Sequence, residues 1–340
     1  DCGGDGRNQA LRSAEPFNGR FCGPRHTDGN FGRGICMNGM KTKCGTKGTE
    51  KWTGYHMKRK LIPYLFVAPA MLVLIAFKVL PICVSIHGSL FKVGARNIRH
   101  FVGLQNFINL FQDNIFYISL KNTIVFNLMT TPVEICFAFI LAAVFNQNLP
   151  GIKVFRTIFY IPVCISMAMA TTVWALMMNP YQGLLNTFLG YFGIGWQGFL
   201  TDPGQALGCI MMIAAWKTIP YWMMFMLAGM QSIPESVYEA ARIDGASIIK
   251  SIFKITIPLM KNTFGFVVIS NSIQNLLLFA PMYIQTNGGP KNATNVLMLE
   301  AYKSAYSYNN MGRSYAIVVI LIVVSILFLN AQNKFFKIVD

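Results

Sequence analysis

A polar, charged stretch, residues 234–261, interrupts two strongly apolar runs and carries residues suited to contact with another protein. Glu239 offers a carboxylate, and charge-assisted hydrogen bonds are stronger than neutral ones. Asp244 and Gly245 break the first of two helical patterns, because glycine accepts turn geometry that a residue with a Cβ resists. A second amphipathic run continues to Pro258. The stretch therefore predicts a helix, a glycine turn and a second helix, which we call the docking loop.

Each predicted helix of the docking loop has an apolar side. Proline suits the first turn of a helix, so we expect the first helix to begin at Pro234. The side chains that we expect this helix to bury are Val237, Ala240, Ala241 and Ile243. The corresponding residues of the second helix, at helical spacing, are Ile248, Ile252 and Ile255.

Composition places the docking loop in an integral membrane protein. Of the 340 residues, 54% are hydrophobic and 12% are charged, whereas soluble proteins carry about 25% charged residues. A net charge of +16 would favour nucleic acid as the partner of a soluble protein. In a membrane protein, basic cytoplasmic loops are a sufficient explanation. We therefore expect membrane lipid, and no nucleic acid, among the partners.

Six apolar runs are long enough to cross a bilayer, since ~20 apolar residues span the hydrocarbon. We expect these spans over residues 62–87, 120–145, 157–178, 206–230, 264–285 and 315–330. The predicted fold class is all-α: a polytopic membrane protein of six transmembrane helices, with the docking loop between spans four and five. Lys and Arg are more frequent on the side of this loop, which favours a cytoplasmic position for it and for both termini.

Residues 1–56 differ from the rest of the chain. They are rich in Gly, Asn and Thr, and they show neither helical nor strand periodicity, so they cannot bury a core. Their four cysteines include no CxxC pair, so the sequence predicts no metal site there. We interpret the segment as a disordered upstream extension, either a misplaced start or a translated leader, with a regulatory tail as the alternative. The transmembrane domain is then residues 57–340.

The docking loop resembles the Glu-Ala-Ala loop through which ABC importer permeases engage their ATPase. Three groups stand at the family's spacing: Glu239-Ala240-Ala241, Asp244-Gly245-Ala246-Ser247 and Ile257-Pro258-Leu259. A lone Glu-Ala-Ala triplet would carry little weight in an alanine-rich chain. The combined pattern, flanked by two membrane spans, is specific.

A second stretch, residues 283–294, resembles the Thr-x-Gly-Gly-Pro-x-x-x-Thr stretch of maltose-type and glycerol-phosphate-type sugar permeases. The matching residues are Thr286, Gly288, Gly289, Pro290 and Thr294. In that family the stretch marks the first of two paired permease subunits. The resemblance covers residues 57–340 and excludes residues 1–56.

The resemblance implies an ATP-driven importer of an oligosaccharide or related glycoside in the bacterial inner membrane, with glycerol-3-phosphate or another polyol phosphate as the alternative. The implied partners are a second homologous permease subunit, two ATPase subunits and an extracytoplasmic sugar-binding protein. ATP and Mg²⁺ would bind the ATPase, so this chain would be no enzyme and would hold no cofactor or metal. It contains no GxxxxGK[ST] phosphate loop. The implied coupling residues are Glu239, Ala240, Ala241, Asp244, Gly245, Ala246, Ile257 and Pro258.

Polar residues inside spans are candidates for the substrate pathway, because they are costly in lipid and tend to face a cavity or another helix. Asn271, Gln274 and Asn275 share one helical face, which suits sugar hydroxyls, with helix packing as the alternative. Glu134 and Lys217 could line the pathway or pair with each other, although helix–helix bonding is the commoner use. Flat surfaces for a sugar ring are offered by Trp216, Trp222 and Phe279.

Two other classes of protein compete with this interpretation. A six-span secondary transporter would need chains of intramembrane charges or inverted repeats, and it would leave the docking loop without a role. A membrane-embedded enzyme would need clustered histidines or paired carboxylates, and the four histidines do not form a motif. Dependence of uptake on an ATPase would separate these classes.

Overall fold

The computed structural model describes residues 64–93, 99–147 and 150–336. Apart from the first three residues of the helix Tyr64–Gly88, the features below belong to the compact unit Val67–Asp340. The predicted extension, residues 1–56, lies outside the described residues, so its interpretation remains a prediction.

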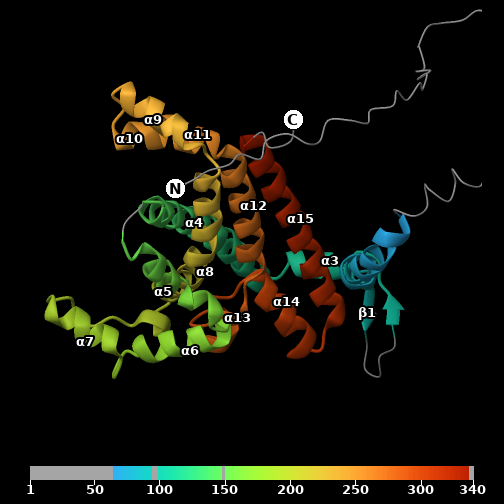
Figure 1. The fold of residues 1–340 in the computed structure, drawn as a ribbon. Coiled ribbons are helices and arrows are strands. Elements are labelled where there is room, and N and C mark those ends of the chain that lie inside the picture. The colour runs from blue at the N-terminus through green and yellow to red at the C-terminus, as the bar shows by residue number, and fades with distance from the viewer. Residues whose placement is uncertain (1–63, 94–98, 148–149, 337–340) are drawn as a thin grey trace, which may run out of the picture. The chain divides into compact units, whose positions relative to one another are not determined.

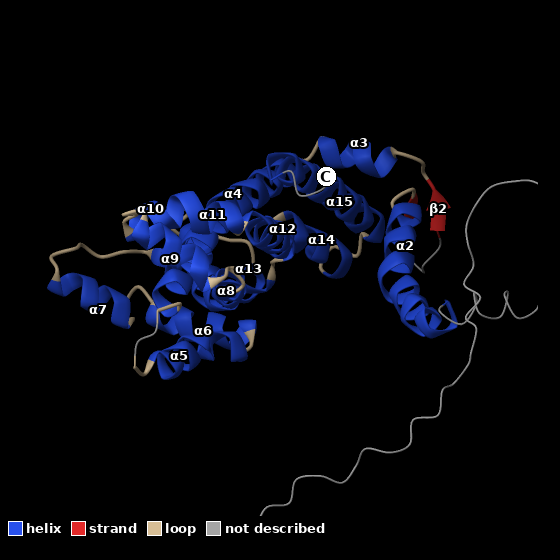
Figure 2. Cartoon of the chain, turned by 45° about the horizontal axis from the view of Figure 1, so that its top comes forward, coloured by secondary structure: helices blue, strands red, loops and turns tan. Residues whose placement is uncertain are grey.

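Five helices of the described part are long and apolar enough to cross a membrane (Figures 1 and 2). They are Tyr64–Gly88, which includes η1 (Ile75–Val79) and α2 (Leu80–Gly88), then α4 (Asn114–Phe145), α8 (Ala206–Gln231), Lys261–Gln285 and α15 (Met311–Phe336). A sixth span results if α5 (Ile152–Cys164) and α6 (Met167–Met177) count together. The predicted all-α polytopic fold is confirmed.

The third predicted span, residues 157–178, is not one continuous helix. α5 and α6 are bent by 97° where Ile165 and Ser166 connect them. Ile165 has an extended backbone, and the Ser166 hydroxyl caps the new helix by accepting a hydrogen bond from the Met169 N–H. Pro162 weakens the last turn of α5, since proline has no N–H to donate. An apolar run thus predicted the length of the segment but not its break.

Lys217 of α8 supplies hydrogen bonds to this break. Its ammonium donates to the carbonyl oxygens of Pro162, Val163 and Ile165 at 3.3, 3.4 and 2.5 Å. Carbonyls at the end of a helix lack intrahelical donors and carry partial negative charge, which favours a cation beside them. A lysine within a span therefore has a structural task at the α5–α6 bend.

The fifth predicted span, residues 264–285, is also interrupted. α12 (Lys261–Leu277) ends where Leu278 adopts an extended backbone, and α13 (Ala280–Gln285) follows with a proline in its first turn. The other elements are the antiparallel pair β1 (Phe91–Val93) and β2 (Arg99–Phe101), α3 (Gln105–Phe111), α7 (Leu184–Tyr191), η3 (Phe199–Thr201) and α14 (Leu297–Tyr306). Both interruptions fall inside apolar runs, where local composition alone predicts helix.

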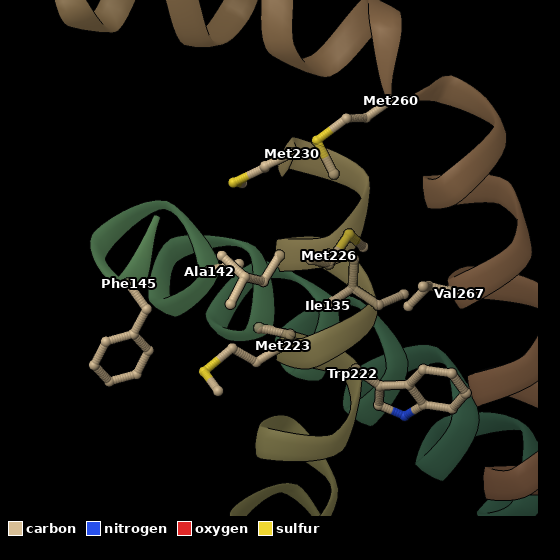
Figure 3. Packing of buried hydrophobic residues seen from close by; sticks show 11 residues of the cluster. Ile135, Ala142, Phe145, Trp222, Met223, Met226, Met230, Met260 and Val267 are labelled. Carbon is tan, nitrogen blue, oxygen red and sulfur yellow. The ribbon is translucent and has the colours of Figure 1, made fainter. Parts of the chain in front are cut away.

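The largest core lies where α4, α8 and α12 meet (Figure 3). Methionine is prominent in it, and this flexible side chain fills irregular gaps between helices. The core methionines are Met223, Met226, Met230 and Met260. Gly229 brings α8 close to α12, because a Cβ at this position would lie 2.8 Å from Thr263 Cγ2. Small residues permit such close approach of membrane helices.

We expect Lys217→Met to destabilise the α5–α6 bend, because it removes the donor to three carbonyl oxygens while keeping a long side chain. Leaving such groups without partners costs roughly 1–3 kcal/mol each. The measurement is the thermal midpoint of the purified protein, with Lys250→Met on the exposed docking loop as the control. An unchanged midpoint for Lys217→Met would show that these bonds do not hold the bend.

Candidate functional site

The docking loop has the predicted form of helix, glycine turn and helix. α9 (Glu235–Ile243) is followed by α10 (Ile248–Ser251), which continues as the π turn η4 (Ile252–Thr256) and α11 (Ile257–Leu259). The second helix extends one residue beyond the predicted end at Pro258. A proline clashes with the carbonyl four residues before it in a regular α-helix, and the π turn changes that register.

Gly245 occupies the turn between the two helices. Its φ is +72°, a region that side chains with a Cβ rarely adopt. The turn closes through hydrogen bonds from Gly245 N–H to the Arg242 carbonyl at 3.0 Å and from Ala246 N–H to the Ala241 carbonyl at 2.9 Å. The Ser247 hydroxyl then caps the second helix by accepting from the Lys250 N–H at 3.3 Å. The turn is thus defined by backbone geometry.

Burial of the docking loop differs from the prediction. Ala241 is buried, but Ala240 is exposed, Ile243 is 86% exposed and Ile248 is 80% exposed. The predicted buried stripes were therefore wrong at these three positions. The reason is that the loop projects beyond the ends of the long helices, so it has little to pack against (Figure 1). Exposed apolar surface of this kind marks an interaction site.

A polar cavity of about 800 Å³ separates the docking loop from the ends of α4, α5 and α8. Its lining includes Asn146, Arg156, Gln231, Tyr238 and Arg242. Across the loop itself, the hydroxyl groups of Tyr238 and Thr256 lie 3.1 Å apart and share a hydrogen bond. A hydrogen bond between side chains therefore joins the first helix of the docking loop to the second.

A second site lies along α4, where polar side chains recur every three or four residues and are buried. We call this row the polar ladder; it consists of Ser119, Thr123, Asn127, Thr131 and Glu134. Asn127 donates to the Ser272 hydroxyl at 2.9 Å, which joins α4 to α12. Glu134 accepts from Thr218 of α8 at 2.5 Å and from Asn275 of α12 at 2.9 Å. The ladder therefore joins three membrane helices.

The predicted pathway face of α12 is divided between two environments. Asn271 and Asn275 are 0% and 4% exposed, and Asn275 donates to Thr131 at 3.0 Å as well as to Glu134. These two residues pack against α4 and do not face open space, which corrects the prediction for them. Gln274 is exposed. Successive residues of a helix point about 100° apart, so Gln274 turns away when Asn275 faces α4.

Glu134 and Lys217 do not pair with each other. Lys217 turns to the carbonyl groups of the α5–α6 bend, while its neighbour Thr218 turns to Glu134. The rotation between consecutive helical residues again separates them. Glu134 and Lys217 therefore each bond one helix to another, which is the commoner role of polar residues inside spans.

The two tryptophans of α8 have unlike surroundings. Trp222 is 2% exposed, so its ring is covered by protein. Trp216 is 37% exposed and contacts Trp174 edge-to-face at 5.7 Å between ring centroids. It lines an apolar cavity of about 500 Å³ together with Val133 and Phe137 of α4. Trp216 can therefore meet a ligand or a lipid, whereas Trp222 cannot.

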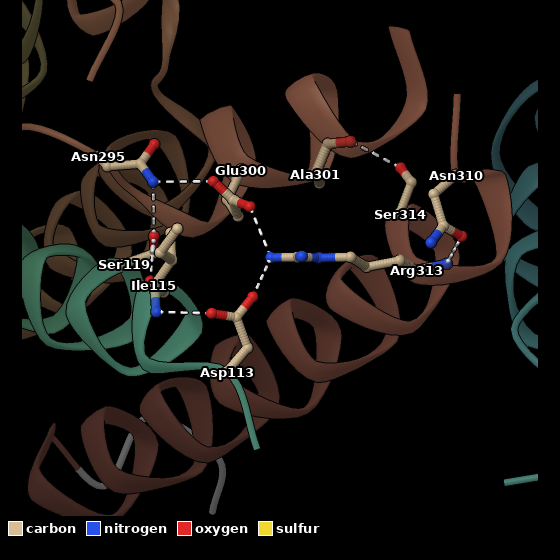
Figure 4. Close-up of polar contacts among 9 residues, drawn as sticks. All are labelled: Asp113, Ile115, Ser119, Asn295, Glu300, Ala301, Asn310, Arg313 and Ser314. Carbon is tan, nitrogen blue, oxygen red and sulfur yellow. Dashed lines mark hydrogen bonds and ion pairs between the residues drawn. The ribbon is translucent and has the colours of Figure 1, made fainter. Parts of the chain in front are cut away.

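A charged cluster joins the first residues of α4 to α14 and α15 (Figure 4). The Arg313 guanidinium lies 2.6 Å from the Asp113 carboxylate and 2.7 Å from that of Glu300. Asn295 donates to Glu300 at 2.8 Å and to Ser119, at the start of the ladder, at 3.0 Å. Because Glu300 is buried, Arg313 compensates a charge that would otherwise be costly there.

The Gly-Gly-Pro stretch is held by its own two threonines. The hydroxyl groups of Thr286 and Thr294 lie 2.5 Å apart, and Thr294 also donates to the Gly289 carbonyl at 2.7 Å. Asn122 of α4 donates to the carbonyl groups of Asn292 and Asn295 at 2.9 and 3.0 Å. The matched threonines are thus the two ends of a rigid loop between α13 and α14.

Sequence analysis missed the polar ladder and the charged cluster. The four-residue spacing of Ser119, Thr123, Asn127 and Thr131 was visible, but a polar stripe does not indicate which helix it faces.

Lys303, near the cluster, donates to the Asn287 carbonyl at 2.7 Å. Burial lowers the pKa of Lys303, and the Glu300 carboxylate opposes this shift.

Comparison with protein families decides the identity of this architecture. Residues 60–337 match the binding-protein-dependent transport system inner membrane component family. The chain belongs to this family. It is therefore a multi-pass component of an inner-membrane transport system, as the resemblance of the docking loop implied.

Curated relatives of the permease are similar over most of their length. It is 34% identical over 285 residues to the probable ABC transporter permease protein YurN of Bacillus subtilis, covering 82% of this chain and 97% of that protein. It is also 34% identical over 278 residues to the sn-glycerol-3-phosphate transport system permease protein UgpA of Agrobacterium fabrum, covering 81% and 94%.

Two solved structures share the fold of the permease. One is a crystal structure of a bacterial ABC transporter involved in the import of the acidic polysaccharide alginate, with a TM-score of 0.73 and 21% identity over 84% of this chain and 98% of that one. The other is the alginate transporter in complex with its periplasmic protein bound to an alginate pentasaccharide, with a TM-score of 0.72, 21% identity, and coverage of 82% and 95%.

We expect Glu134→Leu to destabilise the permease, because it removes the hydrogen bonds that join α4 to Thr218 of α8 and to Asn275 of α12, each worth about 1 kcal/mol net. Glu134→Gln keeps an acceptor oxygen and should be milder. Gln274→Leu, on the exposed side of α12, should leave the thermal midpoint unchanged. Equal midpoints for Glu134→Leu and Gln274→Leu would contradict the assignment of Glu134 to helix bonding.

Proposed function

We propose that the chain is a permease subunit of an ATP-driven importer that takes up an oligosaccharide or related glycoside. It would form half of the translocation pathway, with a second homologous permease subunit as the other half. Two ATPase subunits would supply ATP, Mg²⁺ and hydrolysis, and an extracytoplasmic sugar-binding protein would deliver the substrate. The proposal rests on membership of the family and on the form of the docking loop.

A polyol phosphate is the second candidate substrate. The similarity to the UgpA protein of Agrobacterium fabrum, whose name specifies sn-glycerol-3-phosphate, favours it. The fold shared with the alginate importer is compatible with either substrate, because likeness of fold does not specify a ligand.

The observation that carries the proposal is the unpartnered apolar surface of the docking loop. Ile243 and Ile248 flank the glycine turn, and each is at least 80% exposed. Glu239 is exposed on α9, the helix that also carries Ile243, and it can accept hydrogen bonds from basic groups of an ATPase. A projecting, rigid pair of helices suits the transmission of movement from an ATPase to the membrane helices. We place this loop and both termini in the cytoplasm.

The substrate would pass beside exposed polar and aromatic groups of the membrane helices. Gln274 on α12 and Trp216 on α8 are the candidates whose exposure permits contact with a sugar. Asn275, Glu134 and Lys217 would act indirectly, because their hydrogen bonds set the positions of the helices that line the pathway. Asn271 accepts from Asn275 within α12.

Uptake measurements test the proposed function. Membrane vesicles that contain the permease pair, the ATPase and the binding protein should accumulate radiolabelled oligosaccharide only when ATP is present. Unlabelled glycerol-3-phosphate should compete only if the second candidate is right. Uptake that persists without the ATPase would instead indicate a secondary transporter.

We expect Gly245→Val to impair coupling. A β-branched residue at φ +72° strains the turn by about 1 kcal/mol or more. Apart from Gly245 and its two chain neighbours, no atom of the described chain lies within 4 Å of a Cβ built there, so the added atoms would meet the ATPase instead. The measurements are co-purification of the ATPase and ATP-driven uptake, with the exposed Lys250→Gln as the control. A Gly245→Val protein that retains its ATPase and transports normally would contradict the role of the loop.

A further inference from the structure

Four aromatic rings from α13 and α14 form a continuous cluster. They belong to Phe279, Tyr283, Tyr302 and Tyr306, and we call them the aromatic platform. Tyr302 is central: its ring centroid lies 5.6 Å from that of Phe279, 5.0 Å from that of Tyr283 and 4.8 Å from that of Tyr306. Two of the side chains around Tyr302 are exposed to solvent: Tyr283 is 42% exposed and Tyr306 is 68% exposed. Aromatic surface is thus gathered in one place and left uncovered.

The platform lies at the opposite end of α12 from the docking loop. α12 begins directly after α11 and ends directly before α13, and Figure 1 shows α13 and α14 far from α9–α11. With the docking loop at the cytoplasmic side, as we propose, the platform is on the outer side of the membrane. A substrate released by a binding protein would arrive on this side.

Contact with lipid tails does not account for the two platform rings on α14. α14, which carries Tyr302 and Tyr306, has ten residues and is not one of the helices that can cross a membrane, whereas Phe279 and Tyr283 lie near the end of the candidate span Lys261–Gln285. After Tyr306 the chain continues with the polar residues Ser307, Asn309 and Asn310, and with Tyr308. Three of the four rings carry a phenol hydroxyl, which needs a polar partner. The exposed end of α14, which carries Tyr306, is therefore suited to water and to a polar ligand.

The platform is built on a rigid base. α13 and α14 are the two sides of the Gly-Gly-Pro loop, which the Thr286–Thr294 hydrogen bond closes at 2.5 Å. On α14, the Ala301 carbonyl accepts from Ser314 of α15 at 2.8 Å, and Lys303 is tied to the Asn287 carbonyl. A surface that is ordered before binding loses less entropy when a ligand binds.

We propose that the aromatic platform is an outer binding site for a pyranose ring of the transported oligosaccharide. This assignment rests on the proposed sugar uptake and narrows its substrate class. A pyranose ring presents an apolar C–H face that an aromatic ring can cover, while its hydroxyls bond to the phenol groups of Tyr283, Tyr302 and Tyr306. Glycerol-3-phosphate has no such face. Lys303, the lysine of α14, already donates to a carbonyl and lies beside the Glu300 carboxylate.

The test measures uptake in the assembled transporter with maltopentaose, cellopentaose and an alginate pentasaccharide as probes. Tyr306→Ala and Tyr283→Ala should each raise the apparent KM about 3- to 10-fold for the pentasaccharide that wild type transports. Tyr306→Phe keeps the ring and should have a smaller effect. Tyr191→Ala is the matched control, because Tyr191 is 84% exposed on α7 and lies outside the platform.

Each outcome bears on one of the two proposals. An unchanged KM in both alanine variants would overturn the platform while leaving sugar uptake intact. An equal loss of uptake for every substrate, together with reduced recovery of the complex, would also overturn it, because the rings would then serve packing. ATP-driven uptake of glycerol-3-phosphate alone by wild type would refute the proposed sugar function itself.

Discussion

The polar ladder of α4 is the interaction on which the rest of the structure depends. In a bilayer no water is available to satisfy a buried amide, hydroxyl or carboxyl group, so each must find a partner within the protein. Asn127 and Glu134 find theirs on α12 and α8, and Ser119 receives a hydrogen bond from Asn295, beside α14. This need brings four helices to one line of contact, and the apolar core packs around them.

The same constraint governs the two places where a span stops being regular. At the α5–α6 bend the freed carbonyl oxygens accept from Lys217. At the break after α12 the Leu278 N–H donates to the Asn275 carbonyl at 3.3 Å. Irregular backbone at membrane depth is tolerated where protein groups satisfy it. Each interruption has such groups nearby.

The docking loop differs from the membrane helices, because its shape does not depend on contacts with other helices. Its turn at Gly245 is closed by its own backbone, and a polar cavity separates it from the helix ends. Ile243 and Ile248 therefore remain uncovered in the single chain. The membrane part is held together by contacts between helices, whereas the loop keeps its shape locally and leaves its apolar side for a partner, which is the division expected of a coupling element.

The sequence by itself determined the all-α class, the approximate spans and the helix–turn–helix around Gly245, because hydrophobic length, glycine and proline act locally. It did not determine which way each polar side chain turns. Asn275 meets α4 while Gln274 does not, and Thr218, not Lys217, reaches Glu134. Only the tertiary structure decided these points, because the rotation of a helix about its axis depends on neighbours that are distant in sequence.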